Sequence, residues 1–412
     1  MRITTLFRKF LGVEDVYVQE VDINEGGLFL TVRPRWWLPR CRGCGDVAPG
    51  YDQLPLRSWQ HLPWGKVAVY LVYAPRRVEC KSCGVCAEKL PWAEGNTRFT
   101  AEFEEMVAYL AQLTDKTRVT KLLGISWRAV GRIIERVVQR RLDPGRLEGV
   151  KRIGVDEFSY RKRHRYITIV VDHDRRRVIW AGEGSSTETL EGFFKQLGPD
   201  GCSQIKEVTL DMSAAYIGAV KTSLPQASVI FDRFHVQKLA SDALDEVRRS
   251  IVREQDDPEE ASAVKGTRFA LLKNPWDLTR TEKDKLCEVQ KRNRPLYRAY
   301  LLKETLARAL DYLQPKRATD TLRDWLAWAC RSKLKPFERV AGTIKKHFDG
   351  VLAYVKGRLT NGFTEGINNK LRMVARRAFG FHSAEALIAM LFLTCGGIVL
   401  DPPLPQFNPQ MG

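Results

Sequence analysis

The chain has 412 residues, which is too long for one ordinary domain, and its hydrophobic content of 44% is ample for several folded cores. Lys and Arg number 67 against 49 Asp and Glu, so the net charge is +18 at pH 7. The excess is spread along most of the chain, which indicates a nucleic-acid partner more than a lipid surface. A basic protein without a polyanionic partner is the plain alternative.

Targeting and membrane signals are weak in this sequence. The first ten residues, MRITTLFRKF, lack the apolar region of a secretory signal. Residues 387–400 are strongly apolar, but they are short for a membrane span and contain Gly396 and Gly397. We therefore expect a buried C-terminal helix, no membrane partner and a cytoplasmic, nucleoid-associated protein. Nine unevenly placed cysteines fit a reducing compartment with metal binding better than a disulfide framework.

Residues 1–96 predict an α+β region that contains a zinc finger. A short helix over 6–11 is followed by strands over 16–21 and 28–32. Two Cys-x-x-Cys pairs come next, and each is followed by a glycine. Four thiolates at this spacing can hold one zinc ion tetrahedrally, so the predicted ligands are Cys41, Cys44, Cys80 and Cys83.

Several points about this finger stay open at the level of sequence. The strand-like residues 67–73 are expected to bring the two knuckles together as a zinc ribbon. Cys86 could replace one ligand, His61 is a weaker candidate, and four unligated thiols are the alternative. Arginines interleaved with Trp36, Trp37 and Trp64 suit contacts to DNA, but the same aromatic residues could fill a small core.

Residues 97–146 predict a helix-turn-helix domain. The first helix, over 99–113, would bury Phe103, Met106, Val107, Leu110 and Leu113. A short helix near 119–123, the turn Gly124-Ile125-Ser126 and a longer helix to 141 then form the motif. Its second helix begins with residues suited to DNA contact: Trp127, Arg128 and Arg132. Plain three-helix packing without DNA binding is the alternative.

From residue 150 the pattern changes to that of a mixed sheet. Strands are expected over 150–156, 164–172, 177–180, 208–210 and 229–231, with helices over 187–197, from 213 and from 233. Three antiparallel strands followed by alternating helix and strand are typical of an RNase H-like domain, which we assign to 150–240 and 350–400. Residues 241–349 are expected to be an α-helical insertion, and residues 401–412 a disordered tail.

Carboxylates follow two of these strands. We predict Asp156 and Asp211 at the C-terminal ends of the first and fourth strands, which are neighbours in such a sheet. A helix over 359–377 would bring Glu365 to them, and these three side chains could then hold two divalent ions, Mg²⁺ or Mn²⁺, for phosphoryl chemistry. His235 lies near the start of the helix after Asp232, where it could orient a carboxylate, contact DNA or simply cap the helix.

The helix that carries Glu365 has two different faces. Glu365, Asn369, Arg372 and Arg376 fall on one face, and Ile367, Leu371, Val374 and Ala378 on the opposite one. A carboxylate among an amide and guanidiniums suits a place where metal ions and DNA phosphates meet. The alternative is a basic amphipathic helix in which Glu365 merely pairs with Arg372.

With these motifs in hand, the chain resembles the DDE transposases of bacterial insertion sequences, specifically the ISL-three branch. The resemblance rests on the double Cys-x-x-Cys, the Gly124-Ile125-Ser126-Trp127 turn, and the blocks GVDE at 154–157, LDMS at 210–213 and TNGFTEGINNK at 360–370. It implies Asp156, Asp211 and Glu365 as the metal-binding triad, and Asp232-Arg-Phe-His235 looks like the family's Asp/Cys-x-x-His motif.

The resemblance implies a transposase that binds the terminal inverted repeats of its element and cleaves and joins DNA strands, with a homodimer on paired ends. A non-catalytic DNA-binding protein and a metal-dependent nuclease without strand transfer are the two alternatives.

Overall fold

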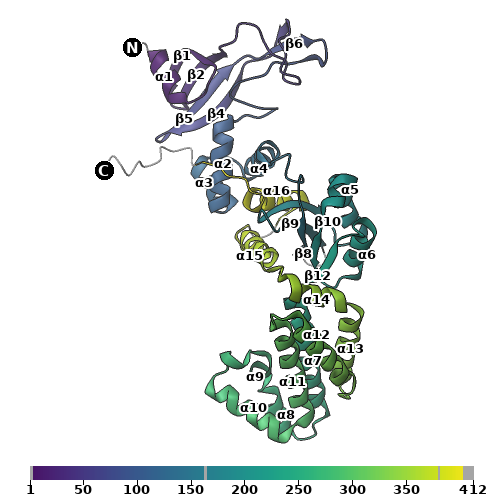
Figure 1. Ribbon diagram of the computed structural model, residues 1–412. Helices are drawn as coiled ribbons and strands as arrows, with labels where there is room; N and C mark the ends of the chain where they lie inside the picture. Colours follow the sequence, from purple (N-terminus) through teal and green to yellow (C-terminus); the bar gives the residue numbers. More distant parts are fainter. Residues whose placement is uncertain (1–2, 162–164, 379–380, 402–412) are drawn as a thin grey trace, which may run out of the picture. The chain divides into compact units, whose positions relative to one another are not determined.

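The computed structural model describes residues 3–161, 165–378 and 381–401, and the chain divides into two compact units (Figure 1). The first comprises Met1–Asp143 together with Arg377–Gly412, and the second comprises Pro144–Arg376. The expected disordered tail lies, from residue 402 onward, outside the described residues. Within the described ranges, no helix combines the length and the apolar character that crossing a membrane requires.

The first unit begins with a helix on a four-stranded sheet. Helix α1 (Ile3–Leu11) is followed by β1 (Val16–Asn24), β2 (Gly27–Pro34), β4 (Arg57–Trp64) and β5 (Val67–Tyr73), in the order β1-β2-β5-β4. Its core contains Trp59 and Trp92, whose rings meet edge to face. The prediction that residues 67–73 join the zinc knuckles is wrong, because β5 pairs with β2 and β4 of this sheet.

The cysteine knuckles have a small sheet of their own. It contains β3 (Gly50–Gln53), β6 (Arg76–Cys80) and β7 (Gly84–Ala87), in the order β3-β6-β7. The second Cys-x-x-Cys is the tight turn between β6 and β7. The apolar core beneath it is only Cys41, Ala48, Val78 and Cys80, with Cys86 packed against it. So small a core gives the knuckles little apolar support of their own.

Three helices then form the helix-turn-helix, namely α2 (Ala101–Leu113), α3 (Lys116–Leu123) and α4 (Trp127–Arg141). Gly124 takes the left-handed conformation that ends α3, with φ 65°, and the Ser126 hydroxyl accepts a hydrogen bond from the Ala129 amide to start α4. Helix α3 begins at Lys116, earlier than expected, because Asp115 caps it. Phe103 and Val107 are buried as predicted, whereas Leu113 is exposed.

The C-terminal helix completes this unit. Helix α16 (Ala384–Cys395) packs against α4 and α2, and the Gln112 side-chain amide donates to the carbonyls of Leu393 at 2.7 Å and Ile398 at 3.3 Å. The structure therefore groups Arg377–Gly412 with the helix-turn-helix, whereas the sequence pattern placed residues up to 400 in the catalytic domain. Hydrophobicity predicted that this helix is buried, but it does not specify the partner.

The second unit is built on a five-stranded sheet. Its strands are β8 (Arg152–Arg161), β9 (Arg165–Asp172), β10 (Arg177–Glu183), β11 (Glu207–Leu210) and β12 (Ser228–Phe231), in the order β10-β9-β8-β11-β12. Strands β8, β9 and β10 are antiparallel, and β11 is parallel to both β8 and β12. The first and fourth strands are thus neighbours, as expected. Helices α5 (Thr187–Gln204) and α6 (Ala214–Ser223) contact β10 and β11.

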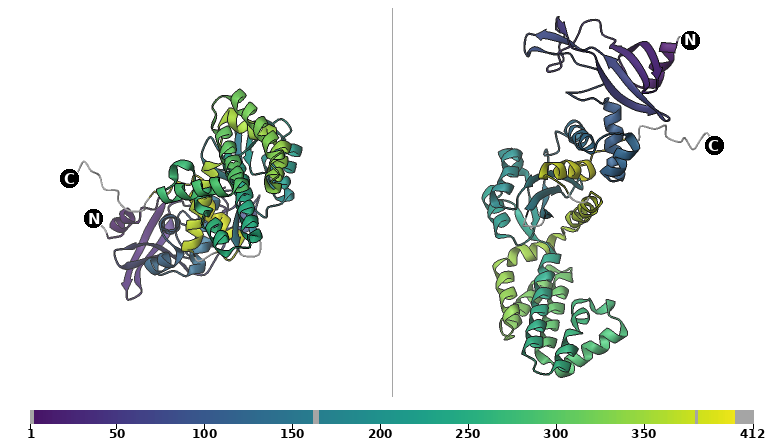
Figure 2. Two further views of the ribbon diagram at one scale, coloured as in Figure 1. Left: turned by 90° about the horizontal axis from the view of Figure 1, so that it is seen from below. Right: turned by 180° about the vertical axis from the view of Figure 1, so that it is seen from behind.

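A helical insertion separates β12 from the helix that carries Glu365 (Figures 1 and 2). Helix α7 (Arg233–Glu254) runs from the sheet into the insertion and packs on α11 (Arg294–Asp311) and α13 (Lys335–Lys346). The remaining elements are α8 (Pro258–Lys265), α9 (Arg268–Leu272), the 3-10 turn η1 (Pro275–Asp277), α10 (Arg280–Arg292), α12 (Pro315–Cys330), α14 (Phe348–Gly357) and α15 (Gly362–Arg377). Helix α14 covers β12 and returns the chain to the sheet.

Candidate active site and DNA-binding elements

Two of the predicted carboxylates lie on adjacent parallel strands. Asp211 follows β11 directly, and β11 pairs with β8 so that Thr209 lies opposite Gly154. The same register carries Asp211 to the level of Asp156. The prediction that Asp156 ends its strand is wrong, because β8 continues to Arg161 through its pairing with β9. Asp156 therefore projects from the middle of a strand, where the backbone pairs with Ile169 of β9.

Helix α15 brings the third carboxylate to this place. The Asn368 side-chain amide donates a 2.8 Å hydrogen bond to Asp156 Oδ2, and Glu365 lies one turn earlier on the same helix. A Cβ atom on Gly154 would lie 2.9 Å from Thr364 Oγ1 and 2.8 Å from His173 Nε2, so only glycine permits this approach. Electrostatic interactions link Asp156 with both Asp211 and Glu365, and the assignment of the three carboxylates to one metal site stays a prediction.

Burial and neighbouring charges disfavour the ionised forms of several carboxylates here. Burial, with smaller contributions from the charges of Asp211 and Glu365, raises the pKa of Asp156 to about 6. Burial also raises the pKa of Glu365, with a contribution from the Asp232 carboxylate. Burial, followed by Asp211 and Asp156, raises the pKa of Glu157. The site therefore concentrates negative charge where water screens it poorly.

A buried polar network holds the start of α15 on the sheet. Asn361 is fully buried, and its side-chain oxygen accepts hydrogen bonds from the hydroxyls of Thr209 on β11 and of Thr364, the latter at 3.3 Å. Its backbone amide lies 3.4 Å from Asp232 Oδ1. Because the network spans β11, the end of β12 and α15, it sets the position of the helix that carries Glu365.

His235 lies beside this network, in the first turn of α7. Its Nδ1 atom is 3.7 Å from Asp232 Oδ2, within the range of an ion pair but too far for a hydrogen bond. The Asp232 carboxylate raises the pKa of the imidazole, burial opposes that rise, and Asp211 and Asp156 add to it. The charged imidazolium is therefore favoured near the carboxylates.

The four predicted zinc ligands converge. The Sγ atoms of Cys41, Cys44, Cys80 and Cys83 all lie within 4.8 Å of one another. Among the described residues, they are the one group of three or more His, Cys, Asp or Glu side chains as close as this. The backbone amide of Cys44 is the main cause that lowers the pKa of the Cys41 thiol to about 6, which favours the thiolate that zinc binds.

The two alternative ligands have different positions. Cys86 Sγ lies 3.3 Å from Cys41 Sγ, at the edge of the cluster but outside the group of four. His61 is buried in the four-stranded sheet, where its ring nitrogens lie 2.9 Å from Thr100 Oγ1 and 3.1 Å from the Leu11 carbonyl. Those two contacts occupy both ring nitrogens, so His61 supports the fold rather than the zinc.

The predicted DNA-contact residues of α4 differ in their surroundings. Arg128 and Arg132 are exposed. Trp127 is 40% exposed, and its ring packs against Lys116 Nζ at 4.6 Å and edge-on against His382 at 5.4 Å. The arginines are therefore free to reach a ligand, whereas the tryptophan is partly held by its own unit.

Three family models match the chain in the order of these elements. One described as the zinc-finger of transposase IS204/IS1001/IS1096/IS1165 matches residues 37–83, and one described as the helix-turn-helix domain of transposase family ISL3 matches residues 88–138. The third model covers the DDE domain of the ISL3 family and is described as transposase. It matches residues 153–391, which is more than half of the chain. The chain belongs to the ISL3 family of transposases.

Similar proteins extend the match to the whole length of this ISL3 transposase. The transposase for insertion sequence element IS1557 of Mycobacterium tuberculosis is 38% identical over 445 residues, with 100% of both chains covered. The transposase for insertion sequence element IS1001 of Bordetella parapertussis is 30% identical over 362 residues, which cover 87% of this chain and 89% of the relative. The expectation of a DNA-binding transposase with a zinc ribbon, a helix-turn-helix and an RNase H-like domain is confirmed.

The two faces of α15 in the ISL3 transposase follow the predicted pattern. Ile367, Leu371 and Val374 are buried, whereas Asn369, Arg372 and Arg376 are exposed. Arg372 Nη1 donates to Asn369 Oδ1 at 2.7 Å. Among the described residues, Glu365 Oε1 has no hydrogen-bond partner, but the Arg372 charge opposes the rise in the pKa of Glu365 that burial causes, so an electrostatic interaction within the helix is present.

Sequence analysis missed several residues around the carboxylates, chiefly Asn368 and Asn361. Asn368 lies three residues after Glu365, a spacing that places it beside Glu365 on a helix and could have indicated its role. Asn361 gave no comparable signal, because its partners come from β11 and the end of β12.

The donor atoms fit divalent cations. Glu365 Oε1 is buried and has no hydrogen-bond partner among the described residues. A buried carboxylate oxygen without a partner is costly in a folded protein unless something else binds it. Oxygen donors from Asp156, Asp211 and Glu365 are the ligands that Mg²⁺ and Mn²⁺ prefer.

Proposed function

We propose that this ISL3 transposase binds the terminal inverted repeats of its own insertion sequence and cleaves and joins DNA strands there. In this proposal Asp156, Asp211 and Glu365 hold Mg²⁺ or Mn²⁺. The observation that supports it most is the approach of α15 to β8, in which Asn368 binds Asp156 while Glu365 Oε1 stays buried without a hydrogen-bond partner among the described residues.

Divalent cations, when bound, supply the positive charge that activates an attacking oxygen and stabilises a leaving oxygen at phosphorus. Residues of the chain itself position the carboxylates for that chemistry. The network of Asn361 and Thr209 holds α15 on the sheet, and Asn368 fixes one oxygen of Asp156. His235, as an imidazolium, is suited to a DNA phosphate or to orienting a neighbouring carboxylate.

The remaining sites bind DNA and zinc. We assign zinc to Cys41, Cys44, Cys80 and Cys83, and the zinc content of the purified chain, with and without Cys41→Ser/Cys44→Ser, tests that assignment. Trp127, Arg128 and Arg132 contact the terminal repeat, and Asn369, Arg372 and Arg376 contact DNA near the cleaved bond. Two ends must be handled together, so we expect a homodimer on paired ends, associated with the nucleoid.

A strand-transfer assay with a DNA duplex that carries the terminal repeat tests the activity. We expect cleavage and joining in Mg²⁺, and loss of both in Asp156→Asn, Asp211→Asn and Glu365→Gln while binding is kept. Cleavage without joining would indicate a nuclease instead, and binding without cleavage would indicate a non-catalytic protein.

A further inference from the structure

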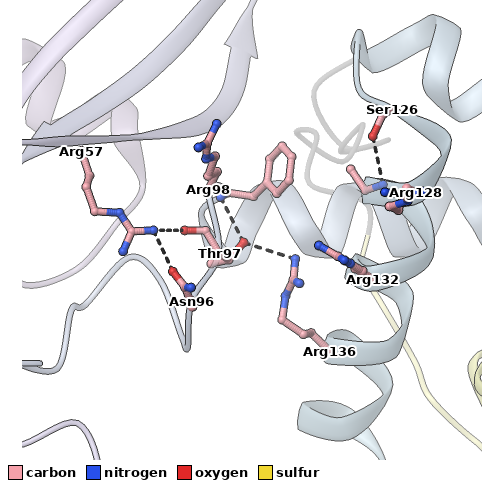
Figure 3. A pocket seen from close by; sticks show the side chains of 10 residues that line it. Arg57, Asn96, Thr97, Arg98, Ser126, Arg128, Arg132 and Arg136 are labelled. Atoms are coloured by element: carbon pink, nitrogen blue, oxygen red, sulfur yellow. Dashed lines mark hydrogen bonds between the residues drawn. The ribbon is translucent and has the colours of Figure 1, made fainter. Parts of the chain in front are cut away.

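A cleft lined with arginines lies between α4 and the segment that precedes α2 (Figure 3). Its volume is about 520 Å³, and it belongs entirely to the first unit. The lining residues are Arg57, Asn96, Thr97, Arg98, Phe99, Ser126, Arg128, Ala129, Arg132 and Arg136. The described residues that line this space carry five guanidiniums and no carboxylate, which makes it a site for a polyanion.

The arginines of this cleft fall into two groups. Arg136 is held by Glu104, to which its Nε donates at 2.8 Å, and Arg57 is held by the Asn96 side chain at 3.0 Å. By contrast, Arg98, Arg128 and Arg132 make no side-chain hydrogen bond or ion pair within the described part of the chain, and all three are exposed. Their charge is thus available to a ligand, while the other two give the cleft fixed walls.

The two walls come from different parts of the sequence. Arg128, Arg132 and Arg136 are spaced by four residues along α4, so they form one stripe of that helix. Arg57 and Arg98 lie across from them, as Figure 3 shows. Backbone hydrogen bonds from the Gln60 amide to the Arg98 carbonyl at 2.8 Å, and from the Thr100 amide to the Gln60 carbonyl at 3.0 Å, tie this wall to β4.

We propose that this cleft clamps the sugar-phosphate backbone of one DNA strand. Arg98 and Arg57 then extend the contact beyond the helix-turn-helix, and Arg128 and Arg132 bind phosphates rather than base edges. Guanidiniums that converge from two walls suit a chain of phosphates, whereas base reading needs side chains aimed into a groove floor. The proposal rests on the proposed binding of terminal repeats, but it concerns binding alone.

The test is the salt dependence of DNA binding by Arg98→Gln and Arg132→Gln in the full chain. Affinity is measured without Mg²⁺ on two duplexes, one with the terminal repeat and one with the same bases shuffled. We expect each variant to lower both affinities by a similar factor. The slope of log affinity against log salt should become less steep by about 1 per lost phosphate contact.

The matched control is Arg292→Gln, which removes an exposed arginine of α10 that pairs with Glu288. It should leave both affinities and the slope unchanged. Arg98→Lys and Arg132→Lys keep the charge and should retain most of the slope, which separates lost contacts from a damaged fold.

A loss of affinity confined to the terminal-repeat duplex, with the slope unchanged, would assign these arginines to base reading and overturn the clamp. Unchanged affinity on both duplexes would also overturn it. Neither result depends on cleavage, so the clamp and the carboxylate site can fail independently.

Discussion

The buried surroundings of Asp156 disfavour its ionised form. Burial raises its pKa from 3.8 to about 6, so the folded state prefers the protonated form more than the unfolded chain does. The stability that this preference contributes is present at low pH and is lost as the pH rises through about 6. At pH 7 without Mg²⁺, the ionised Asp156 therefore costs the protein stability.

Asp156→Asn removes that charge, so we expect the variant to be more stable than the parent at pH 7, by about 1–2 kcal/mol. The difference should shrink as the pH falls from 7 toward 4, because the parent then becomes protonated. Urea unfolding of zinc-loaded, magnesium-free protein measures it. A variant no more stable than the parent at pH 7 would show that the ionised Asp156 carboxylate does not destabilise the folded protein.

Asn368 offers a second test at the scale of single residues, with Met373 of the same helix as a control. Asn368→Ala removes the 2.8 Å hydrogen bond to Asp156 Oδ2, and we expect cleavage to slow by about 10- to 100-fold with DNA binding unchanged. Met373→Ala changes a side chain of α15 that is 59% exposed. It should keep the cleavage rate at saturating DNA. A cleavage rate of Asn368→Ala equal to that of the parent would remove Asn368 from the site.

At the scale of elements, Gly154 sets how closely α15 approaches β8. A methyl group there would lie within 3.0 Å of Thr364 Oγ1, His173 Nε2 and Val171 Cγ2, so Gly154→Ala must displace these side chains and disturb the contact between α15 and the sheet. We expect a loss of about 1–3 kcal/mol in stability and of most cleavage activity.

The control is Gly366→Ala on α15 itself, where the added methyl group meets nothing within 4 Å. Alanine favours a helix, so this variant should be neutral or more stable by up to about 1 kcal/mol. Thermal unfolding and single-turnover cleavage distinguish the pair. Full activity in Gly154→Ala would mean that the close approach is unnecessary.

The limits of sequence reasoning are clearest for the elements. Local patterns predicted strands over 16–21 and 28–32, which the structure extends to 16–24 and 27–34, together with the turn at Gly124 and the buried face of α15. They did not predict that β8 runs past Asp156, because the added residues are held by pairing with β9. They also placed β5 beside the zinc knuckles, since its parallel partner β2 is distant in sequence. The partner of Asn368 lies 212 residues away, beyond any local signal.

At the scale of the whole molecule, the chain returns to its first unit after α15. Leu391 of α16 is fully buried there, whereas Val399 is 84% exposed. Leu391→Ala should destabilise the DNA-binding unit by about 2–5 kcal/mol and weaken DNA binding near its unfolding transition. Val399→Ala should change stability by less than about 0.5 kcal/mol. Equal stability of the two variants would show that α16 does not contribute to the stability of the first unit.

The central claim is that the three carboxylates hold the catalytic metal directly, and Asp211→Cys tests it. A thiolate is a poor ligand for Mg²⁺ and a better one for the softer Mn²⁺. We therefore predict that Asp211→Cys cleaves terminal-repeat DNA in Mn²⁺ but not in Mg²⁺, while the parent cleaves in both. Equal cleavage by the variant in the two metals, at the parent's rate, would contradict a metal-binding role for Asp211.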